Sequence, residues 1–250
     1  MCVAAMAWMA HPRWQLVAIG NRDELHARPT APLARWDNGV LAGQDLQAGG
    51  TWLGVHPDGR RFALVTNRRV EGGPQPGRAS RGALVTQCLL GMPLTDLATL
   101  NPFNLFVVAN SQARLMTNDP VAVSSTLAPG IHGLSNGAPE DRWFKTAQLE
   151  IALAAWLERA GAPADLLEPL GDRCPDPAEA DNLFTAPFIR NERYGTRCSS
   201  VVAIDRAGAG VIIERRFDEL GVVTGETALD FRWPFRNNAP PANAAVPAPP

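Results

Sequence analysis

The chain has 250 residues, of which 46% are hydrophobic and 19% charged, and its formal net charge at pH 7 is −2. This length predicts one domain with a full hydrophobic core, and the composition excludes a wholly disordered chain. No excess of basic residues is present to neutralise phosphates, so nucleic acid is not expected as a partner. Of the 23 basic residues, 22 are arginine and one is Lys145, a bias for which genome base composition is the simpler explanation.

No apolar run approaches the ~18 residues that a membrane helix needs, so no integral membrane segment is expected. The apolar stretch before His11-Pro12-Arg13 lacks the positively charged start of a secretory signal. The four cysteines, at positions 2, 88, 174 and 198, match neither a zinc site nor a dense disulfide framework. These features favour a reducing compartment, and we expect a cytoplasmic protein without a metal site.

Two hairpins are predicted in the first part of the chain, because β-type segments alternate with turn residues. The first joins Val3–Ala10 to Gln15–Gly20, and the second joins Thr51–His56 to Arg61–Asn67. Pro57-Asp58-Gly59 supplies favourable turn geometry in the second hairpin.

The middle of the chain mixes loop, helix and strand. The expected order is a loop over 69–79, a helix of about ten residues from Ser80, a short helix after Pro93, and strands at Asn104–Asn110, 113–117 and 121–126.

The last part of the chain begins with the clearest predicted helix, Glu140–Arg159. Its expected buried stripe consists of Trp143, Ala147, Ile151, Ala154 and Leu157. Further helix is expected within 164–170 and 177–184, then strands at 197–205, 210–217 and 226–232, and a flexible Pro/Ala-rich tail at 238–250. Because strands open and close the chain, we predict one α+β domain over 1–237 with mostly antiparallel sheets.

Cys2 is the first candidate for chemistry. If Met1 is removed, a free α-amine lies on the same residue as a thiol, and an α-amine with a pKa near 8 can act as its general base. An N-terminal cysteine would then be a strong nucleophile. The alternative is an ordinary buried thiol at the start of a strand.

The polar segment Asn21-Arg22-Asp23-Glu24 follows the second predicted strand. The open end of the first hairpin brings this segment next to residue 2 or 3. Arg22 could lower the pKa of the thiol, and a carboxylate could hold the α-ammonium. The alternative is an exposed ion-pair turn.

Three later polar clusters lie at the ends of apolar strands, and they include Asn67, Asn136 and Arg197. A side-chain amide can donate to a developing oxyanion, and an arginine can hold a carboxylate. Taken alone, each cluster is more typical of turn capping than of a functional site. No G-x-S-x-G, P-loop or GxGxxG motif occurs, which weighs against a serine hydrolase, an NTPase and a dinucleotide enzyme.

Taken in order, these motifs resemble those of the NRDE family, the transport and Golgi organization protein 2 homologue family. The matching segments are Cys2, Asn21-Arg22-Asp23-Glu24, Ala27-Arg28-Pro29-Thr30, Gly50-Thr51-Trp52-Leu53-Gly54, Thr66-Asn67, Ser80-Arg81-Gly82, Phe103-Asn104-Leu105, Gly133-Leu134-Ser135-Asn136 and Tyr194-Gly195-Thr196-Arg197. The resemblance covers residue 2 to about 235.

That family is in turn similar to N-terminal nucleophile (Ntn) hydrolases of the choloylglycine hydrolase type, which implies a four-layer αββα sandwich. The resemblance assigns catalytic positions to Cys2, Arg22, Asp23, Asn67, Asn136 and Arg197. It places Asn21, Glu24, Trp52, Ser135 and Thr196 around a ligand. In the hydrolases two residues separate the arginine from the aspartate, whereas Arg22 and Asp23 are adjacent and would face opposite ways in a strand.

The residues and the resemblance leave two candidate functions. The first is an Ntn-type cysteine amidohydrolase or acyltransferase acting on a small amide, ester or thioester, with no cofactor required. The second is a non-catalytic protein that binds and carries haem or an acyl-CoA-like lipid. For haem, Cys2, Met6, His11 and His26 are the candidate axial ligands, and the arginines of the 68–81 loop could receive propionates or phosphates.

Overall fold

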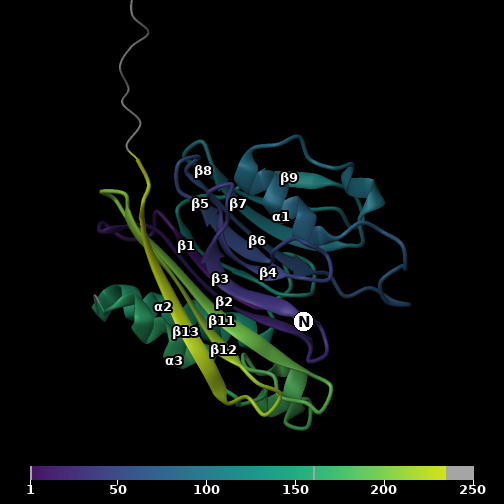
Figure 1. Ribbon diagram of the computed structural model, residues 1–250. Helices are drawn as coiled ribbons and strands as arrows, with labels where there is room; N and C mark the ends of the chain where they lie inside the picture. The colour runs from purple at the N-terminus through teal and green to yellow at the C-terminus, as the bar shows by residue number, and fades with distance from the viewer. Residues whose placement is uncertain (1, 160, 235–250) are drawn as a thin grey trace, which may run out of the picture.

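The computed structural model describes residues 2–159 and 161–234, and two antiparallel β-sheets packed face to face form its centre (Figure 1). The predicted tail at 238–250 lies outside the described residues. The α+β class and the mostly antiparallel pairing are confirmed.

The first sheet has six strands in the order β10-β1-β2-β11-β12-β13. Its strands are β1 (Val3–Trp8), β2 (Trp14–Leu25), β10 (Gly130–Leu134), β11 (Tyr194–Asp205), β12 (Ala209–Phe217) and β13 (Val223–Arg232). Because β1 is flanked by β2 and β10, this first strand lies inside the sheet and not at its edge.

The second sheet has seven strands, which follow one another across the sheet in chain order. They are β3 (Thr30–Arg35), β4 (Leu41–Asp45), β5 (Leu53–His56), β6 (Arg61–Asn67), β7 (Phe103–Ala109), β8 (Gln112–Thr117) and β9 (Val123–Thr126). Both predicted hairpins are confirmed. The strands β3, β4 and β10 were not predicted, since they are short segments with glycine, proline or polar residues in place of a clear alternation.

The helical elements are α1 (Arg81–Leu90), α2 (Phe144–Arg159), α3 (Leu167–Leu170) and the short 3-10 turns η1 (Leu97–Thr99), η2 (Pro163–Leu166), η3 (Pro177–Glu179) and η4 (Leu183–Thr185). The helix predicted from Ser80 is confirmed, and the Ser80 side chain caps it by accepting from the backbone N–H of Gly82. The helices expected after Pro93 and over 177–184 are only 3-10 turns.

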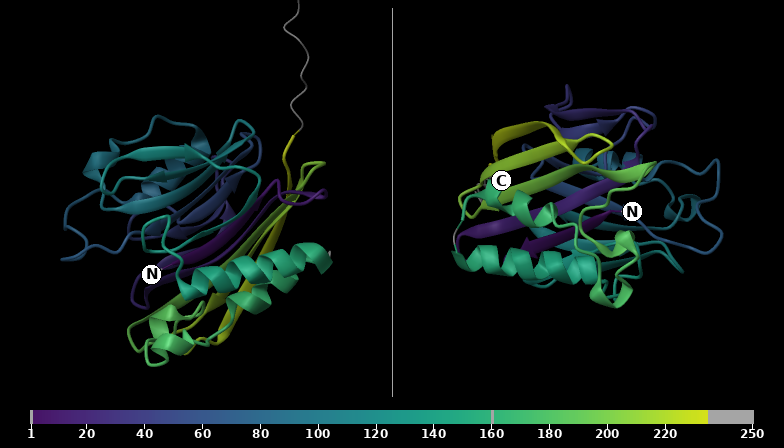
Figure 2. Two further views of the ribbon diagram at one scale, coloured as in Figure 1. Left: turned by 180° about the vertical axis from the view of Figure 1, so that it is seen from behind. Right: turned by 90° about the horizontal axis from the view of Figure 1, so that it is seen from below.

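Three hydrophobic clusters hold these parts together. The largest lies between the two sheets, the second between the six-stranded sheet and α2 with α3, and the third between the seven-stranded sheet and α1. Figure 2 shows α2 lying along the outer face of the six-stranded sheet, on the side opposite the other sheet.

The predicted stripe of α2 is wrong, because Ile151 is 63% exposed and of the five stripe residues only Leu157 is buried. The buried face instead consists of Lys145, Thr146, Leu149, Leu153, Trp156 and Leu157. Two polar residues belong to this face, so a pattern of apolar side chains alone could not find it.

The segment Asn21-Arg22-Asp23-Glu24 does not follow β2, as predicted, but forms part of it. The backbone continues as a strand because β11 pairs with it, with Gly195 opposite Glu24 and Cys198 opposite Arg22. The polar side chains of this strand are therefore fixed in a sheet, which makes their positions more definite than those of turn residues.

Candidate functional site

Cys2 lies directly before β1, beside the polar end of β2. Since Val3 pairs with Asn21, Cys2 comes next to Arg22, and Cys198 pairs with Arg22 on its other side. Ala4 packs between the sheets whereas Val3 packs toward α2, so alternation along the strand places the Cys2 side chain on the inter-sheet side.

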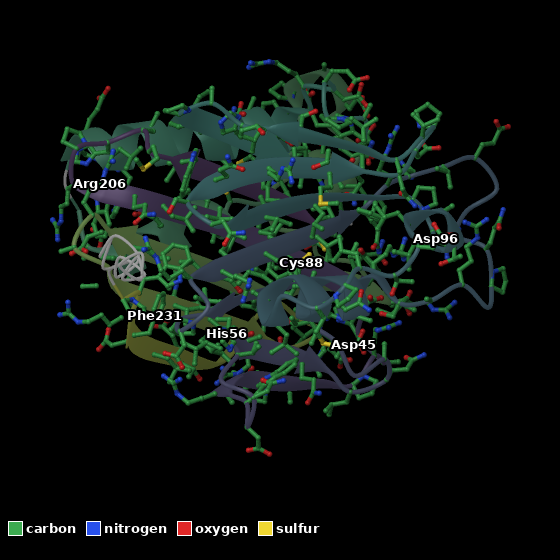
Figure 3. The ribbon with its side chains drawn as sticks, turned by 90° about the horizontal axis from the view of Figure 1, so that it is seen from above. Asp45, His56, Cys88, Asp96, Arg206 and Phe231 are labelled. Carbon is green, nitrogen blue, oxygen red and sulfur yellow. The ribbon has the colours of Figure 1, made fainter. Side chains whose placement is uncertain are left out.

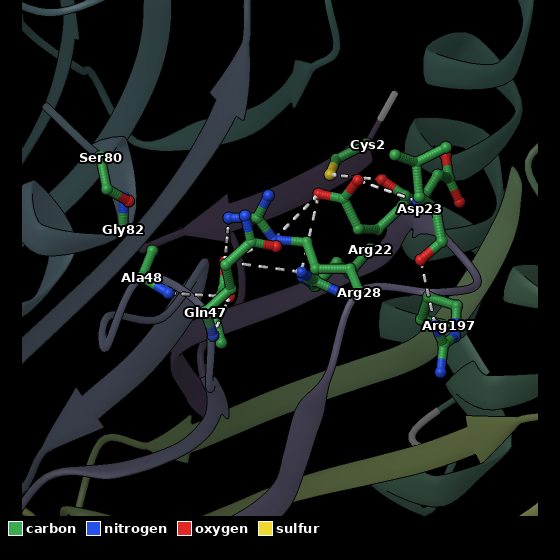
Figure 4. Close-up of polar contacts among 12 residues, drawn as sticks. Cys2, Arg22, Asp23, Arg28, Gln47, Ala48, Ser80, Gly82 and Arg197 are labelled. Atoms are coloured by element: carbon green, nitrogen blue, oxygen red, sulfur yellow. Dashed lines mark hydrogen bonds and ion pairs between the residues drawn. The ribbon is translucent and has the colours of Figure 1, made fainter. Parts of the chain in front are cut away.

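A cavity of about 360 Å³ opens at this end of the inter-sheet space. Seven predicted site residues line it, namely Cys2, Arg22, Asp23, Glu24, Trp52, Asn67 and Arg197. They come from the residue directly before β1, from β2, β6 and β11, and from the segment before β5, so residues far apart in the sequence meet at one place. Figure 4 shows Cys2, Arg22, Asp23 and Arg197 among them. The other four, Asn21, Ser135, Asn136 and Thr196, do not line the cavity.

The Cys2 side chain is buried, and its Sγ lies 4.0 Å from the backbone oxygen of Asp23, to which it donates. Burial raises the pKa of the Cys2 thiol; the carboxylate of Asp23 adds to this, and Arg22 opposes it. The expected lowering by arginine therefore exists but is smaller than the effect of burial. A nucleophilic Cys2 needs a base to take its proton, because this environment does not favour a standing thiolate.

Asp23 is buried and faces away from Arg22, as the strand geometry predicts. Its Oδ1 accepts from Thr196 Oγ1 at 2.7 Å, and its backbone oxygen accepts from the hydroxyl of Tyr194 at 2.7 Å. Burial raises the pKa of Asp23 to about 6, although Lys145, Thr196 and Arg22 favour the ionised form. This pKa is well above that of an ordinary aspartate, and such a shift is typical of carboxyl groups at functional sites.

A charge network forms another part of the cavity wall. Arg28 Nη2 lies 2.7 Å from Asp45 Oδ2, and Glu24 Oε2 lies 3.7 Å from both Arg22 and Arg28. Arg22 Nη2 also lies 3.9 Å from Asp45 Oδ2, so the network joins β2 to β4 across the two sheets. It holds Arg22 in place while leaving its Nη1 without a hydrogen-bond partner among the described residues.

The two predicted amide donors have different positions. The exposed Asn67 lines the cavity, and its side chain has no hydrogen-bond partner within residues 2–159 and 161–234. Asn136 is buried and donates from Nδ2 to the backbone oxygen of Asn67 at 2.5 Å. Asn67 is therefore placed to reach a bound molecule, whereas Asn136 supports the backbone on which Asn67 lies.

The remaining predicted residues hold backbone segments around the site in place. Ser135 Oγ donates to the backbone oxygen of Cys2 at 3.0 Å, which fixes the start of β1. Asn21 uses its amide on the oxygens of Leu170 and Pro187, 2.8 and 2.9 Å away, and so faces α3. Arg197 lines the cavity and donates from Nη1 to the oxygens of Leu25 and His26.

Asp45 and Lys145 belong to this site without having been predicted there, and Asp45 anchors the charge network. Of the arginines of the 68–81 loop, which were expected to receive propionates or phosphates, Arg78 and Arg81 line the cavity. Burial lowers the pKa of Arg81, and the nearby charges of Cys2 and Glu24 oppose that change. Lys145 is fully buried and interacts electrostatically with Asp23 and Cys2. The sequence carried one signal for it, since Lys145 is the single lysine among 22 arginines.

The other cysteines have different surroundings. Cys88 packs between α1 and the seven-stranded sheet (Figure 3), and burial raises the pKa of its thiol to about 11. Cys198 is buried and also lines the cavity, and burial raises the pKa of its thiol. Cys174 is exposed. Within the described ranges, no group of three or more His, Cys, Asp or Glu side chains is arranged to hold a metal ion.

The fold and the site together define an α+β protein with a polar, arginine-rich cavity between two antiparallel sheets and with Cys2 and Cys198 in its wall. The sequence profile of the Transport and Golgi organisation 2 family matches residues 1–219. The chain belongs to this family, as its motifs predicted.

Named relatives extend over most of the chain. The Transport and Golgi organization 2 homolog of Mus musculus is 28% identical over 257 residues, and the Transport and Golgi organization protein 2 homolog of Bos taurus is 30% identical over 264 residues. The human homolog is 28% identical over 265 residues. Each alignment covers 86% of this chain and 92% of the relative.

Proposed function

We propose that the protein is an Ntn-type cysteine hydrolase or acyltransferase in which Cys2, exposed as the first residue by removal of Met1, attacks a small amide, ester or thioester. One observation carries the proposal: Cys2, Arg22, Asp23, Asn67 and Arg197 all line one cavity. At about 360 Å³ the cavity lies at the small end of the usual range for ligand sites, which favours a small substrate. The helix-covered pair of sheets supports the αββα comparison on which this assignment draws.

In the proposed reaction the Cys2 sulfur forms a bond to the substrate carbonyl carbon, and the thiol proton passes to the α-amine of the same residue. The side-chain amide of Asn67 donates to the oxyanion that develops, an interaction worth roughly 3–4 kcal/mol of barrier in comparable sites. The α-ammonium returns the proton to the leaving group as the bond to it breaks. Water or an acceptor then attacks the thioester and regenerates the thiol.

Each charged neighbour has a distinct part in this scheme. Arg22 lies beside Cys2 and stabilises negative charge on sulfur, because it is the closest cation on the adjoining strand. Asp23 lies on the other face of β2, and its carboxylate stabilises the α-ammonium that forms when the thiol is deprotonated. Arg197 and Arg81 add positive charge to the wall, which favours substrates that carry a carboxylate or phosphate.

Turnover of a panel of acyl-amides and acyl-thioesters tests the proposal. Wild type should hydrolyse at least one member, and Cys2→Ala should lose that activity, whereas Cys174→Ser should keep it because Cys174 is exposed and does not line the cavity. Equal activity of wild type and Cys2→Ala would contradict the proposal.

The arginine-rich wall also favours a second candidate, a carrier of an acyl-CoA-like or haem-like ligand. Of the candidate haem ligands, Cys2 lines the cavity, whereas Met6 is buried between the sheets and His26 bonds to the oxygen of Asn191 at 2.9 Å. Tight haem or acyl-CoA binding by a protein with no turnover on the panel would favour this candidate. Either function is proposed for a cytoplasmic protein, which cell fractionation can test; no helix among the described residues is long and apolar enough to span a membrane.

A further inference from the structure

Lys145 is an unusual buried residue that the scheme above does not use. Its side chain has no exposed surface, and its Nζ has neither a hydrogen bond nor an ion pair within the described parts of the chain. The ring of Trp143 is a weak compensating contact, with Nζ 5.7 Å from its centroid. A buried ammonium without a close partner is costly, and an apolar side chain of the same length would fill this space more favourably.

The direction of α2 places Lys145 at the Cys2 end of the six-stranded sheet. Trp156, near the end of α2, packs against Trp14 at the start of β2, with ring centroids 5.5 Å apart and the ring planes tilted by 38°. Trp14 lies at the turn of the hairpin formed by β1 and β2. The start of β1 and the polar end of β2 lie at the open end of this hairpin. The first turn of α2, with Lys145, therefore reaches the start of β1.

The packing of the next residue supports this placement. Thr146 lies so close to Gly133 that a Cβ on that glycine would come within 2.1 Å of the Thr146 methyl group. Gly133 pairs with Ala5 of β1. A glycine is thus required for the first turn of α2 to lie this close to the sheet, and the contact fixes the base of the Lys145 side chain.

Three charged groups act on Lys145: Asp23 from β2, Cys2 at the start of β1 and Arg69 from the segment after β6. Burial lowers the pKa of the Lys145 amine, while Asp23 and Cys2 favour its protonated form and Arg69 opposes it. Reciprocally, Lys145 favours the ionised form of Asp23. The buried amine and the buried carboxyl therefore each favour the charged form of the other.

We propose that Lys145 is a positioning residue for the Cys2 site: its ammonium is the buried counter-charge of Asp23 and offsets the repulsion between that carboxylate and a Cys2 thiolate. The inference deepens the proposed function and rests on Cys2 as the reacting group. Lysine suits this position because its compact ammonium fits a buried site and can release its proton, which arginine does not do. In a chain whose other basic residues are all arginine, the lysine occupies the position where a titratable cation is needed.

The single lysine permits a direct test. In the full chain labelled with ¹³C-lysine, one side-chain resonance reports the protonation of Lys145 over a pH titration. Asp23→Asn should shift its midpoint down by one pH unit or more, because the carboxylate that stabilises the ammonium is lost. Glu150→Gln is the control, since Glu150 lies on the same helix but pairs with Arg142 at 3.8 Å, and it should leave the midpoint unchanged. A midpoint near the ordinary value of about 10.4 that is insensitive to Asp23→Asn would overturn the inference.

A second measurement follows Cys2 itself. Lys145→Met should move the pH profile of Cys2 alkylation upward by about one unit, which makes the reaction about tenfold slower below the midpoint. Thr146→Val, the matched control on the adjacent buried position, should leave the profile in place. An unchanged profile in Lys145→Met would contradict the inference, and this readout is independent of whether any acyl substrate is turned over.

Discussion

Asp23 shows how one residue is placed at a cost to stability. It lies within a strand, fully covered, where an aliphatic side chain would be more favourable. Thr196 donates to its carboxylate, and Lys145 and Arg22 supply positive charge, yet burial still dominates the pKa. Such a group is typical of a site in which chemistry outweighs stability.

This cost predicts how stability depends on pH. The pKa of Asp23 rises from 3.8 to about 6 on folding, so between these values the folded chain holds a proton that the unfolded chain has lost. Ionisation of Asp23 therefore lowers the free energy of unfolding as the pH rises through this window. Asp23→Asn should stabilise the protein by up to about 3 kcal/mol above pH 6, with the gain fading by about pH 4.

Urea unfolding at pH 4, 5 and 7.5 measures this gain. Asparagine can still accept from the Thr196 hydroxyl, so the substitution removes the charge and keeps that contact. A stability difference that does not vary with pH would contradict the assignment.

At the level of single residues, the sequence predicted the main members of the site but not their individual tasks. Cys2, Arg22 and Asn67 were identified by position and chemistry, and they line the cavity. The sequence could not show that Asn67 lines the cavity while Asn136 supports it. This difference arises because the Asn136 side chain donates to the backbone oxygen of Asn67. Lys145 was missed because lysine is normally exposed, and only tertiary packing shows that this one is buried.

Among the elements, the approach of α1 to the cavity depends on a contact between two backbones. A Cβ on Gly50 would lie 2.3 Å from the backbone carbon of Gly82, so only glycine lets the first turn of α1 come this close. Ser80, Arg81 and Gly82 reach the cavity wall as a result. The motif around Gly50 therefore has a structural reason that no strand propensity reveals.

Gly50→Ala should lower the free energy of unfolding by about 2 kcal/mol or more, because the clash is with backbone and cannot be relieved by a side-chain rotation. Gly49→Ala is the control: Gly49 has a φ of +75° with open space around it, so only backbone strain of about 1 kcal/mol is expected. Chemical denaturation of both variants measures the difference, and equal losses would contradict the role given to the contact.

Element prediction was best where alternation or helical pattern was strong. The hairpins and α1 were found because each has apolar residues bounded by turn or capping signals. The extension of β2 through four polar residues was missed, since pairing with β11 across 170 or so residues of chain stabilises it and local preference does not. The same long-range pairing creates the site.

For the molecule as a whole, the two sheets must stay in register for the cavity to keep its shape. Besides apolar packing, Glu214 of β12 joins them, because its Oε1 accepts from the backbone N–H of Leu33 in β3 at 2.8 Å. The same oxygen lies 3.2 Å from Arg216 Nη1, and both Glu214 and Arg216 line the cavity. Glu214 therefore joins the two sheets and forms part of the cavity wall at the same time.

Glu214→Ala should lower the free energy of unfolding by about 1–3 kcal/mol, since a buried backbone donor loses its partner. Glu226→Ala also removes a carboxylate paired with an arginine, here Arg215 at 2.8 Å, but its side chain is 40% exposed. It should cost less than about 1 kcal/mol. Thermal unfolding of both variants measures the two losses of stability. A larger loss in Glu214→Ala shows that the buried contact with Leu33 matters more than the loss of an ion pair.

The central claim is that Cys2, freed of Met1, is the reacting group of the cavity. Intact-mass and peptide analysis of the Cys174→Ser protein after brief treatment with a small acyl electrophile measures this directly. The account predicts one adduct, on an N-terminal peptide that begins with Cys2, formed before any on Cys88 or Cys198. A protein that retains Met1, or one in which the three thiols react equally, would contradict it.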